Sequence, residues 1–185
     1  MTFVAQPLVI IVGGPAGTGK TTTARLLAEH YDCPFLEGDD FHPQANLEKM
    51  ARGEPLTDDD RWDWLKTVSE HASQVAQDVK NPSHICIASC SMLKKVYRDY
   101  IKSCADGLRL RFVFLHTSIE KLAARVAARQ GHFMKLDMVQ LQYDIMEVPG
   151  DAELLVNGGD ALAVEMSDMT PAEVESYIVG RLSLN

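Results

Sequence analysis

The sequence predicts an α/β domain in which a parallel sheet carries helices on both faces. Short apolar runs alternate along the chain with stretches of helical spacing, which is the pattern that produces such sheets. The run Ile85-Cys86-Ile87-Ala88 is apolar throughout, as expected for a strand covered on both faces. A glycine-rich loop joins the first apolar run to the first helical stretch. The 185 residues fit one domain with a substantial core, so we expect residues 1–185 to form a single domain.

The glycine-rich loop matches a phosphate-binding motif. From Gly14 it reads G-x-x-x-x-G-K-[ST], and it follows the apolar run Leu8-Val9-Ile10-Ile11-Val12. Glycines let backbone N–H groups converge on an anion, and the helix N-terminus adds partial positive charge. We expect Lys20 to contact the β- and γ-phosphates of ATP and Thr21 to hold Mg²⁺. A plain strand-to-helix turn is the alternative, but such a turn does not require a lysine and a threonine at these positions. The nucleotide-binding residues are then Gly14, Pro15, Ala16, Gly17, Thr18, Gly19, Lys20, Thr21 and Thr22.

A second predicted strand carries acidic residues to the edge of the sheet. The apolar run Cys33-Pro34-Phe35-Leu36 ends in Glu37-Gly38-Asp39-Asp40, and ligands bind at the carboxyl ends of strands in open α/β sheets. A motor or GTPase would have its Mg²⁺-binding Asp after another apolar strand, whereas the strand at Ile85 ends in Ser89-Cys90-Ser91. Glu37 and Asp39 are expected opposite the phosphate-binding loop, where one can assist Mg²⁺ and the other can accept a proton from a substrate hydroxyl. This arrangement suits a small-molecule kinase, and a solvated turn is the alternative.

The remaining elements follow from apolar periodicity and turn residues. A short helix passes through Leu47 and Met50 and closes at Gly53, and a long helix begins at Asp58-Asp59-Asp60-Arg61. Its apolar face is expected to contain Trp62, Leu65, Val68, Ala72, Val75, Ala76 and Val79. The later elements are expected to be a helix from Met92 to about Cys104, a strand over Leu110–Leu115, a helix capped by Ser118, a helix from about Leu136 to Glu147, a polar loop over Asp151–Asp160, a strand over Leu162–Met166 and a helix that starts at the capping box Thr170-Pro171-Ala172-Glu173.

The composition excludes several classes of protein. A net charge of −8 argues against a nucleic-acid-binding surface, which would carry a basic patch. Cys33, Cys86, Cys90 and Cys104 lack C-x-x-C spacing and a His-rich partner segment, so we expect reduced thiols rather than a zinc site or disulfides. Residues 1–12 lack a basic leader, and no apolar run approaches membrane-spanning length. We therefore expect a cytoplasmic protein without a nucleic-acid or membrane partner.

Several longer stretches follow one another in an order that is more specific than the phosphate-binding loop alone. They are Glu37-Gly38-Asp39-Asp40-Phe41-His42-Pro43, Asn46-Leu47-Glu48-Lys49-Met50, Gly53-Glu54-Pro55-Leu56-Thr57-Asp58-Asp59-Asp60-Arg61, Cys90-Ser91-Met92-Leu93-Lys94-Lys95-Val96-Tyr97-Arg98-Asp99, and Arg125 through Arg129 into Gly131-His132-Phe133. Together they resemble the gluconokinases, the small P-loop enzymes that make 6-phosphogluconate. The resemblance runs from about Leu8 to Pro149.

The resemblance implies a fold and an activity. The fold is that of a P-loop kinase related to the nucleoside monophosphate kinases: a three-layer sandwich with a five-stranded parallel sheet in the order 2-3-1-4-5 and a helical lid at about residues 125–147. The implied activity is ATP-dependent, Mg²⁺-assisted phosphorylation of D-gluconate at its 6-hydroxyl, in gluconate catabolism that feeds the pentose phosphate pathway. Relatives of this kind also imply a homodimer.

The resemblance further assigns roles to residues. Gluconate is a polyol with a carboxylate, so its pocket needs a cation and mixed hydrogen-bonding groups. The implied substrate-binding residues are Asp39, His42, Arg61, Lys94, Lys95, Arg98 and His132. The implied catalytic residues are Lys20, Asp39 as the base, and Arg125 and Arg129 as lid arginines, while Thr21 and Glu37 form the implied Mg²⁺ site, Glu37 through water.

Several of these assignments have a plainer alternative. Lys94 and Lys95 lie about 100° apart on a helix, so at least one can be a solvated surface residue. His42 can be a turn residue before Pro43. Lys121, Arg125 and Arg129, spaced i, i+4 and i+8, can form a solvated basic stripe.

Two departures from the gluconokinase pattern concern local geometry. Asp40 stands where the family often has an apolar residue, and the segment Ala152–Asp160 is longer than expected before the last strand. The alternative functions are a shikimate or adenylylsulfate kinase, which would share the fold, and a non-catalytic ATP-dependent regulator. The intact Lys20, Thr21 and Asp39 and the lid arginines argue against the regulator.

Overall fold

The computed structural model describes residues 6–129, 136–166 and 168–182. Its five-stranded parallel sheet has the order β2-β3-β1-β4-β5, which confirms the order implied by the resemblance. The strands are β1 (Leu8–Gly13), β2 (Phe35–Glu37), β3 (Ile85–Ser89), β4 (Arg109–His116) and β5 (Ala161–Glu165). Because β1 is the central strand, the loop that follows it opens at the middle of the carboxyl edge of the sheet.

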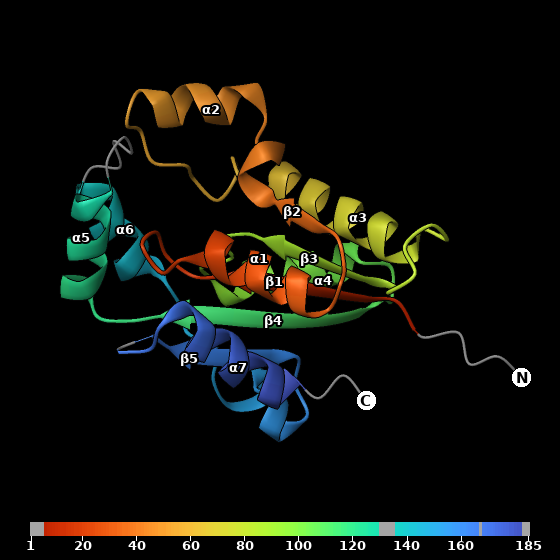
Figure 1. Cartoon of the computed structure of the whole chain (residues 1–185). Helices are drawn as coiled ribbons and strands as arrows, with labels where there is room; N and C mark the ends of the chain where they lie inside the picture. Colours follow the sequence, from red (N-terminus) through yellow and green to blue (C-terminus); the bar gives the residue numbers. More distant parts are fainter. Residues whose placement is uncertain (1–5, 130–135, 167, 183–185) are drawn as a thin grey trace, which may run out of the picture.

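Helices cover both faces of this sheet, and further helices stand beyond the edge where the glycine-rich loop lies (Figure 1). The helices are α1 (Lys20–His30), α2 (Gln44–Ala51), α3 (Trp62–Gln77), α4 (Lys95–Cys104), α5 (Ile119–Ala128), α6 (Leu136–Ile145) and α7 (Pro171–Leu182), with the short 3-10 helices η1 (Gly38–Phe41), η2 (Asp151–Glu153) and η3 (Leu155–Asn157). In the portions of the chain that the structure describes, no helix is both long and apolar enough to cross a bilayer.

The core is divided by the sheet into two halves, and β1 contributes to both. Val9 and Ile11 are buried in the half that contains α3 and α4, whereas Leu8, Ile10 and Val12 are buried in the half that contains α1 and α7. Successive strand side chains point to opposite faces, so a strand covered on both sides is apolar at every position. This burial fixes β1, and with it the position at which the glycine-rich loop begins.

Two helix starts confirm the predicted capping. The Ser118 hydroxyl accepts a hydrogen bond from the backbone N–H of Lys121 at the start of α5. At α7, the backbone N–H of Thr170 donates to the Glu173 carboxylate at 2.7 Å, and the Glu173 N–H donates back to the Thr170 hydroxyl at 3.3 Å. Each cap satisfies donors that the first turn of a helix leaves unpaired.

The predicted starts of α3 and α4 were too early. Helix α4 begins at Lys95 instead of Met92, because Met92 has φ 30°, in the left-handed region that interrupts a right-handed helix. Helix α3 begins at Trp62 instead of Asp58, because Asp60 closes a turn in which its carboxylate accepts from the backbone N–H of Thr57 at 2.8 Å.

The apolar face predicted for α3 was correct in its centre and wrong at its end. Val79 is 89% exposed, because the helix ends at Gln77 and Asp78 is extended. At the start of the helix, Trp64 is fully buried while Trp62 is only partly covered. Trp64 is the first of the buried α3 residues that recur every four positions and face the sheet. Its indole N–H donates to the carbonyl oxygen of Gly38, directly after β2.

Candidate active site

The glycine-rich loop connects β1 to α1 in a conformation that requires glycine. Gly14 has φ 127°, and a Cβ atom there would lie 2.1 Å from the Leu115 carbonyl oxygen. Gly19 has φ 81° and immediately precedes α1, so the loop ends at the unpaired N–H groups of a helix N-terminus. The Thr18 hydroxyl donates to the Pro15 carbonyl oxygen at 2.8 Å and holds the loop closed on itself. The loop has the form of an anion-binding site.

A cavity of about 390 Å³ opens beside this loop, and we call it the first cavity. It brings together residues from the loop, from the end of β2, from α2 and the turn after it, from the end of α5 and from α6. The lining residues are Ala16, Gly17, Gly19, Lys20, Thr21, Glu37, Asp39, His42, Met50, Gly53, Leu56, Arg61, Ser91, Arg129, Met138 and Gln142. The structure thus collects cationic, anionic and neutral polar groups around one space.

Glu37 is held rigidly at the wall of the first cavity. Its Oε2 accepts a hydrogen bond of 2.7 Å from the Thr21 hydroxyl, and its Oε1 accepts one from the Ser89 hydroxyl. The Ser89 oxygen in turn accepts from the backbone N–H of Gly38 at 3.2 Å. Gly38 allows this close approach, since a Cβ atom there would lie 1.9 Å from the Ser89 carbonyl oxygen.

The oxygen atoms of Thr21 and Glu37 fit a magnesium site. Mg²⁺ prefers hard oxygen ligands and is usually bound by one or two protein groups together with water and substrate phosphates. Within the described residues there is no group of three or more His, Cys, Asp and Glu side chains placed to hold a metal. A metal in the first cavity would therefore depend on a bound nucleotide to complete its coordination.

Asp39 lines the first cavity from a position just beyond the end of β2. The segment Gly38–Phe41 is a 3-10 helix, so the alternation of an extended strand does not relate Asp39 to Glu37. Asp40, the next residue of this 3-10 helix, is exposed and is not a lining residue. Burial lowers the pKa of the Lys20 ammonium, and the negative charge of Asp39 acts in the opposite direction. The lysine and the carboxylate are thus electrostatic neighbours across the cavity.

The side chain of His42 is stacked on Trp64 at the wall of the first cavity. The ring centroids lie 4.1 Å apart with an interplanar angle of 16°, and the Trp64 indole N–H donates to the Gly38 carbonyl oxygen at 2.7 Å. Burial, together with the positive charge of Arg61, lowers the pKa of His42 from 6.5 to about 4. His42 is therefore a neutral imidazole at neutral pH.

Arg61 is a buried cation that faces the first cavity. Its side chain belongs to a residue only 8% exposed, and the guanidinium lies 5.7 Å from the centroid of the Tyr97 ring. Its Nε is buried without a hydrogen-bond partner among the described residues. Burying an N–H donor without a hydrogen-bond acceptor costs free energy, and a bound carboxylate would supply that acceptor.

Three basic residues that the resemblance assigned to the substrate do not line the first cavity. Lys94 contacts the Asp58 carboxylate at 2.8 Å, and Lys95 contacts Asp99 at 2.6 Å. Arg98 is 1% exposed, and its guanidinium donates to both carboxylate oxygens of Glu153, at 2.9 and 3.0 Å. Each of these cations has an acidic partner elsewhere in the fold. His132 lies outside the described residues.

A second cavity of about 410 Å³ also borders the glycine-rich loop. It is lined by Gly17, Thr18, Gly19, Thr22, Thr23, Arg125, Ala128, Arg129, Met166, Met169 and Pro171. Arg129 lines both cavities, whereas Arg125 lines only the second and has its guanidinium 3.5 Å from the Met166 carbonyl oxygen. The two cavities meet at the loop, as expected if phosphates bridge a nucleotide and a second substrate.

The structure also places residues at the site that the sequence did not single out. Gln142 of α6 accepts a hydrogen bond of 2.8 Å from the backbone N–H of Ala16 in the loop. Trp64 supports His42, and the Asn46 amide contacts the same imidazole. Asn46 stands in one of the stretches that resemble gluconokinases, which was the available signal for it, whereas Trp64 and Gln142 lie in predicted helices outside those stretches and carried no such signal.

Known proteins are similar to most of this chain. A family profile described as an AAA domain matches residues 9–147. The probable gluconokinase of Saccharomyces cerevisiae is 46% identical over 146 residues, which cover 76% of this chain and 75% of that protein. The thermoresistant gluconokinase of Escherichia coli is 34% identical over 170 residues, which cover 92% of this chain and 91% of that protein.

A solved structure agrees with these similarities. The crystal structure of a gluconokinase from Sinorhizobium meliloti superposes with a TM-score of 0.79 at 38% sequence identity. The superposition covers 96% of this chain and 92% of that chain. The similarity therefore extends beyond the 9–147 region to nearly the whole fold.

Proposed function

The chain belongs to the gluconokinase family of P-loop kinases and phosphorylates gluconate with ATP (EC 2.7.1.12), and we propose that it does so at the 6-hydroxyl within the first cavity. The observation that carries this placement is that Lys20, Asp39 and Arg61 line one space. A phosphate-binding lysine, a proton acceptor and a buried cation are the groups that transfer from ATP to an anionic polyol requires. The product is 6-phosphogluconate, an intermediate of carbohydrate metabolism.

Lys20 and Asp39 have complementary roles in the proposed transfer. The Lys20 ammonium, which now donates to the Pro15 carbonyl oxygen at 3.2 Å, turns to the β- and γ-phosphates when ATP binds the loop. Asp39 accepts the proton of the attacking hydroxyl. Phosphoryl transfer needs little covalent chemistry from the protein, so positioning and charge neutralisation account for most of the catalysis.

Arg61 is the proposed partner of the gluconate carboxylate. It is the buried cation of the first cavity with an unsatisfied Nε, and a planar guanidinium binds a carboxylate through parallel hydrogen bonds. His42 offers a neutral polar group for a hydroxyl at the same wall. Of the cations that the resemblance assigned to the substrate, this proposal keeps Arg61 and leaves out Lys94, Lys95 and Arg98, because each of those three is paired with a carboxylate and none lines the first cavity.

Thr21 and Glu37 are the proposed protein groups for Mg²⁺, Glu37 through a water molecule. When bound, Mg²⁺ neutralises charge on the transferring phosphates. The two side chains are already joined by a hydrogen bond of 2.7 Å, so their oxygen atoms are held on the same side of the loop. Ser89 holds the second Glu37 oxygen in place.

The proposed nucleotide position follows from the second cavity. We place the nucleoside of ATP there, between Thr22 and Met169, with the phosphates lying along the loop toward Lys20. Arg125 and Arg129 belong to a lid at about residues 125–147, and Arg129 lines both cavities, so closure of the lid would bring it over the phosphates. Closure also excludes water and limits ATP hydrolysis.

The proposal also includes a cytoplasmic homodimer, which the family resemblance implies. Sedimentation at several protein concentrations tests the dimer. The reaction is tested by ³¹P NMR of the products formed from Mg²⁺, ATP and gluconate, with Lys20→Ala as the control. A phosphomonoester on the primary 6-hydroxyl supports the proposal, whereas a different phosphorylated position, or ADP and free phosphate alone, contradicts it.

A further inference from the structure

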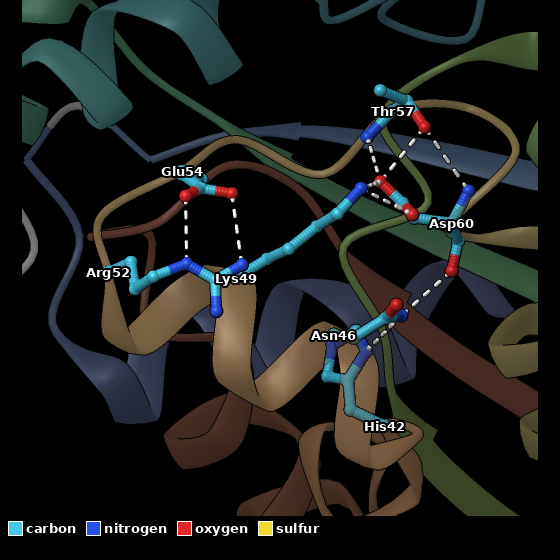
Figure 2. Close-up of polar contacts among 7 residues, drawn as sticks. All are labelled: His42, Asn46, Lys49, Arg52, Glu54, Thr57 and Asp60. Carbon is cyan, nitrogen blue, oxygen red and sulfur yellow. Dashed lines mark hydrogen bonds and ion pairs between the residues drawn. The ribbon is translucent and has the colours of Figure 1, made fainter.

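The Asn46 side chain forms a bridge between His42 and the turn that precedes α3 (Figure 2). Its Nδ2 lies 2.7 Å from the carbonyl oxygen of Asp60 and 3.3 Å from Nδ1 of His42. Asn46 is 3% exposed, so these protein contacts satisfy an amide group that water cannot reach.

The contact with Asp60 fixes the orientation of the Asn46 amide. A carbonyl oxygen accepts hydrogen bonds only, so the atom that faces it at 2.7 Å must be the amide nitrogen and not the amide oxygen. The second N–H of the same nitrogen then points to Nδ1 of His42, which must be a bare acceptor. In a neutral imidazole the proton must therefore be on Nε2.

The protonated Nε2 of His42 faces the proposed catalytic base. It lies 3.8 Å from Oδ1 of Asp39, which is too far for a hydrogen bond but close enough for one oxygen atom to contact both groups. A hydroxyl group has one hydrogen to donate and lone pairs that accept. It would donate its proton to Asp39 and accept from the Nε2–H of His42.

We propose that Asn46 is a positioning residue that holds His42 in its Nε2–H tautomer, so that His42 and Asp39 together bind one hydroxyl group of the phosphoryl acceptor. This inference rests on the proposed function, because it identifies the groups that recognise the acceptor in the first cavity. Asn46 itself does not touch the substrate. It acts through the imidazole, as outer residues commonly do when they select a histidine tautomer.

The surroundings of Asn46 are built to keep this arrangement rigid. The Asp60 carboxylate accepts from Lys49 Nζ at 2.7 and 2.8 Å and from the backbone N–H of Thr57 at 2.8 Å, which holds the Asp60 main chain opposite Asn46 (Figure 2). On the other side, the stacked ring of Trp64 fixes the plane of the His42 imidazole. The lowered pKa of His42 keeps the ring neutral, so that its two nitrogen atoms remain chemically distinct at neutral pH.

The tautomer can be measured directly in the wild-type protein. We expect ¹⁵N NMR of the histidine rings at neutral pH to show His42 neutral and protonated at Nε2. A ring protonated at Nδ1, or a doubly protonated ring, would overturn the inference whatever the activity of the enzyme. Conversely, absence of turnover with gluconate in a protein that shows the Nε2–H tautomer would contradict the proposed function rather than this assignment.

Substitutions at Asn46 and Lys49 separate tautomer selection from support of the turn. Asn46→Asp keeps the size but loses the hydrogen bond to the Asp60 carbonyl oxygen and presents only acceptors to Nδ1, so the proton should move to Nδ1 and kcat/KM for gluconate should fall about tenfold or more, with KM for ATP nearly unchanged. Lys49→Met breaks the ion pair with Asp60 without contacting His42, and should leave the tautomer unchanged and lower kcat/KM much less. Equal losses in the two variants with an unchanged tautomer would show that Asn46 acts only through the turn.

Substitutions at His42 test the same idea without depending on Asn46. A Gln side chain can place its N–H near the position of Nε2, whereas an Asn side chain reaches only the position of Nδ1. His42→Gln should therefore retain about tenfold more kcat/KM for gluconate than His42→Asn. The inference is contradicted if the Asn variant is as active as the Gln variant while both are folded.

Discussion

The hydroxyl of Thr21, at the start of α1, donates a hydrogen bond of 2.7 Å to Oε2 of Glu37, at the end of β2. This contact links the phosphate-binding loop to a strand that is separated from it in the sheet by β3. Ser89, at the end of that intervening strand, holds the other Glu37 oxygen. The ends of β2 and β3 and the start of α1 thus converge on one carboxylate, which is the group we propose for the outer coordination of Mg²⁺.

The first prediction concerns the magnesium requirement. Glu37→Gln keeps the shape of the side chain but removes its charge, so the Mg²⁺ concentration for half-maximal turnover at fixed ATP should rise about tenfold. Asp40→Asn, at an exposed neighbour that does not line the first cavity, should leave this concentration unchanged. An unaltered magnesium titration for Glu37→Gln would remove Glu37 from the proposed metal site.

The second prediction concerns the catalytic base. Asp39→Asn removes the proton acceptor but conserves size, so turnover should fall by about 10² or more while the complex of ATP and Mg²⁺ still binds. Asp40→Asn is again the matched control, since the two residues are adjacent in η1 but only Asp39 lines the first cavity. Pre-steady-state measurement of the transfer step checks this, and similar losses in the two variants would exclude Asp39 as the base.

Much of the fold could be predicted because local patterns determine it. The continuous apolar runs of β1 and β3 identify strands buried on both faces, and the capping box at Thr170 marks the start of α7. The glycine-rich loop was recognisable for the same reason, since its glycines, Lys20 and Thr21 stand in a fixed spacing. These features depend on neighbours in the sequence.

The parts that could not be predicted depend on pairs far apart in the sequence. Nothing near Arg98 shows that it faces the interior of the fold, because its partner Glu153 lies 55 residues later. Trp64 and Gln142 reach the site through main-chain groups of η1 and of the loop, at separations of 26 and 126 residues. Such contacts leave no periodic pattern in the sequence. The resemblance therefore remained the only guide to Arg98 and placed it at the substrate, whereas the structure pairs it with Glu153.

The third prediction follows from this burial of Arg98. Arg98→Met should lower the free energy of unfolding in urea by about 3 kcal/mol or more, because it leaves the Glu153 carboxylate without its buried partner. Lys95→Met, which removes an exposed pair with Asp99, should change this free energy much less. A higher KM for gluconate in Arg98→Met with unchanged stability would return Arg98 to the substrate site.

The fourth prediction concerns stability and pH. Burial, followed by the charge of Arg61, lowers the pKa of His42 from 6.5 to about 4, and Arg61 and Asp39 are charged groups that face the ring. Between these pH values the folded protein binds fewer protons at His42 than the unfolded chain, so the free energy of unfolding should fall as the pH is lowered from about 6.5 towards about 4.

The matched comparison for this pH dependence is the His42→Gln variant. Unfolding in urea at about pH 7 and about pH 5 should show a smaller loss of stability on acidification in this variant than in the wild-type protein. Other groups titrate equally in both proteins and cancel in the comparison. Identical pH dependences would show that His42 has no lowered pKa in the folded state.

The most direct test of the whole account is ADP release measured with a coupled assay across a panel of acceptors. At saturating ATP and Mg²⁺, gluconate should accelerate ADP release by about 10³ or more over the reaction without acceptor, and Lys20→Ala should abolish that acceleration. Shikimate, adenylylsulfate and nucleoside monophosphates should give little acceleration. If gluconate does not stimulate ADP release, or if another acceptor of the panel does so with higher kcat/KM, the assignment of the first cavity to gluconate is wrong.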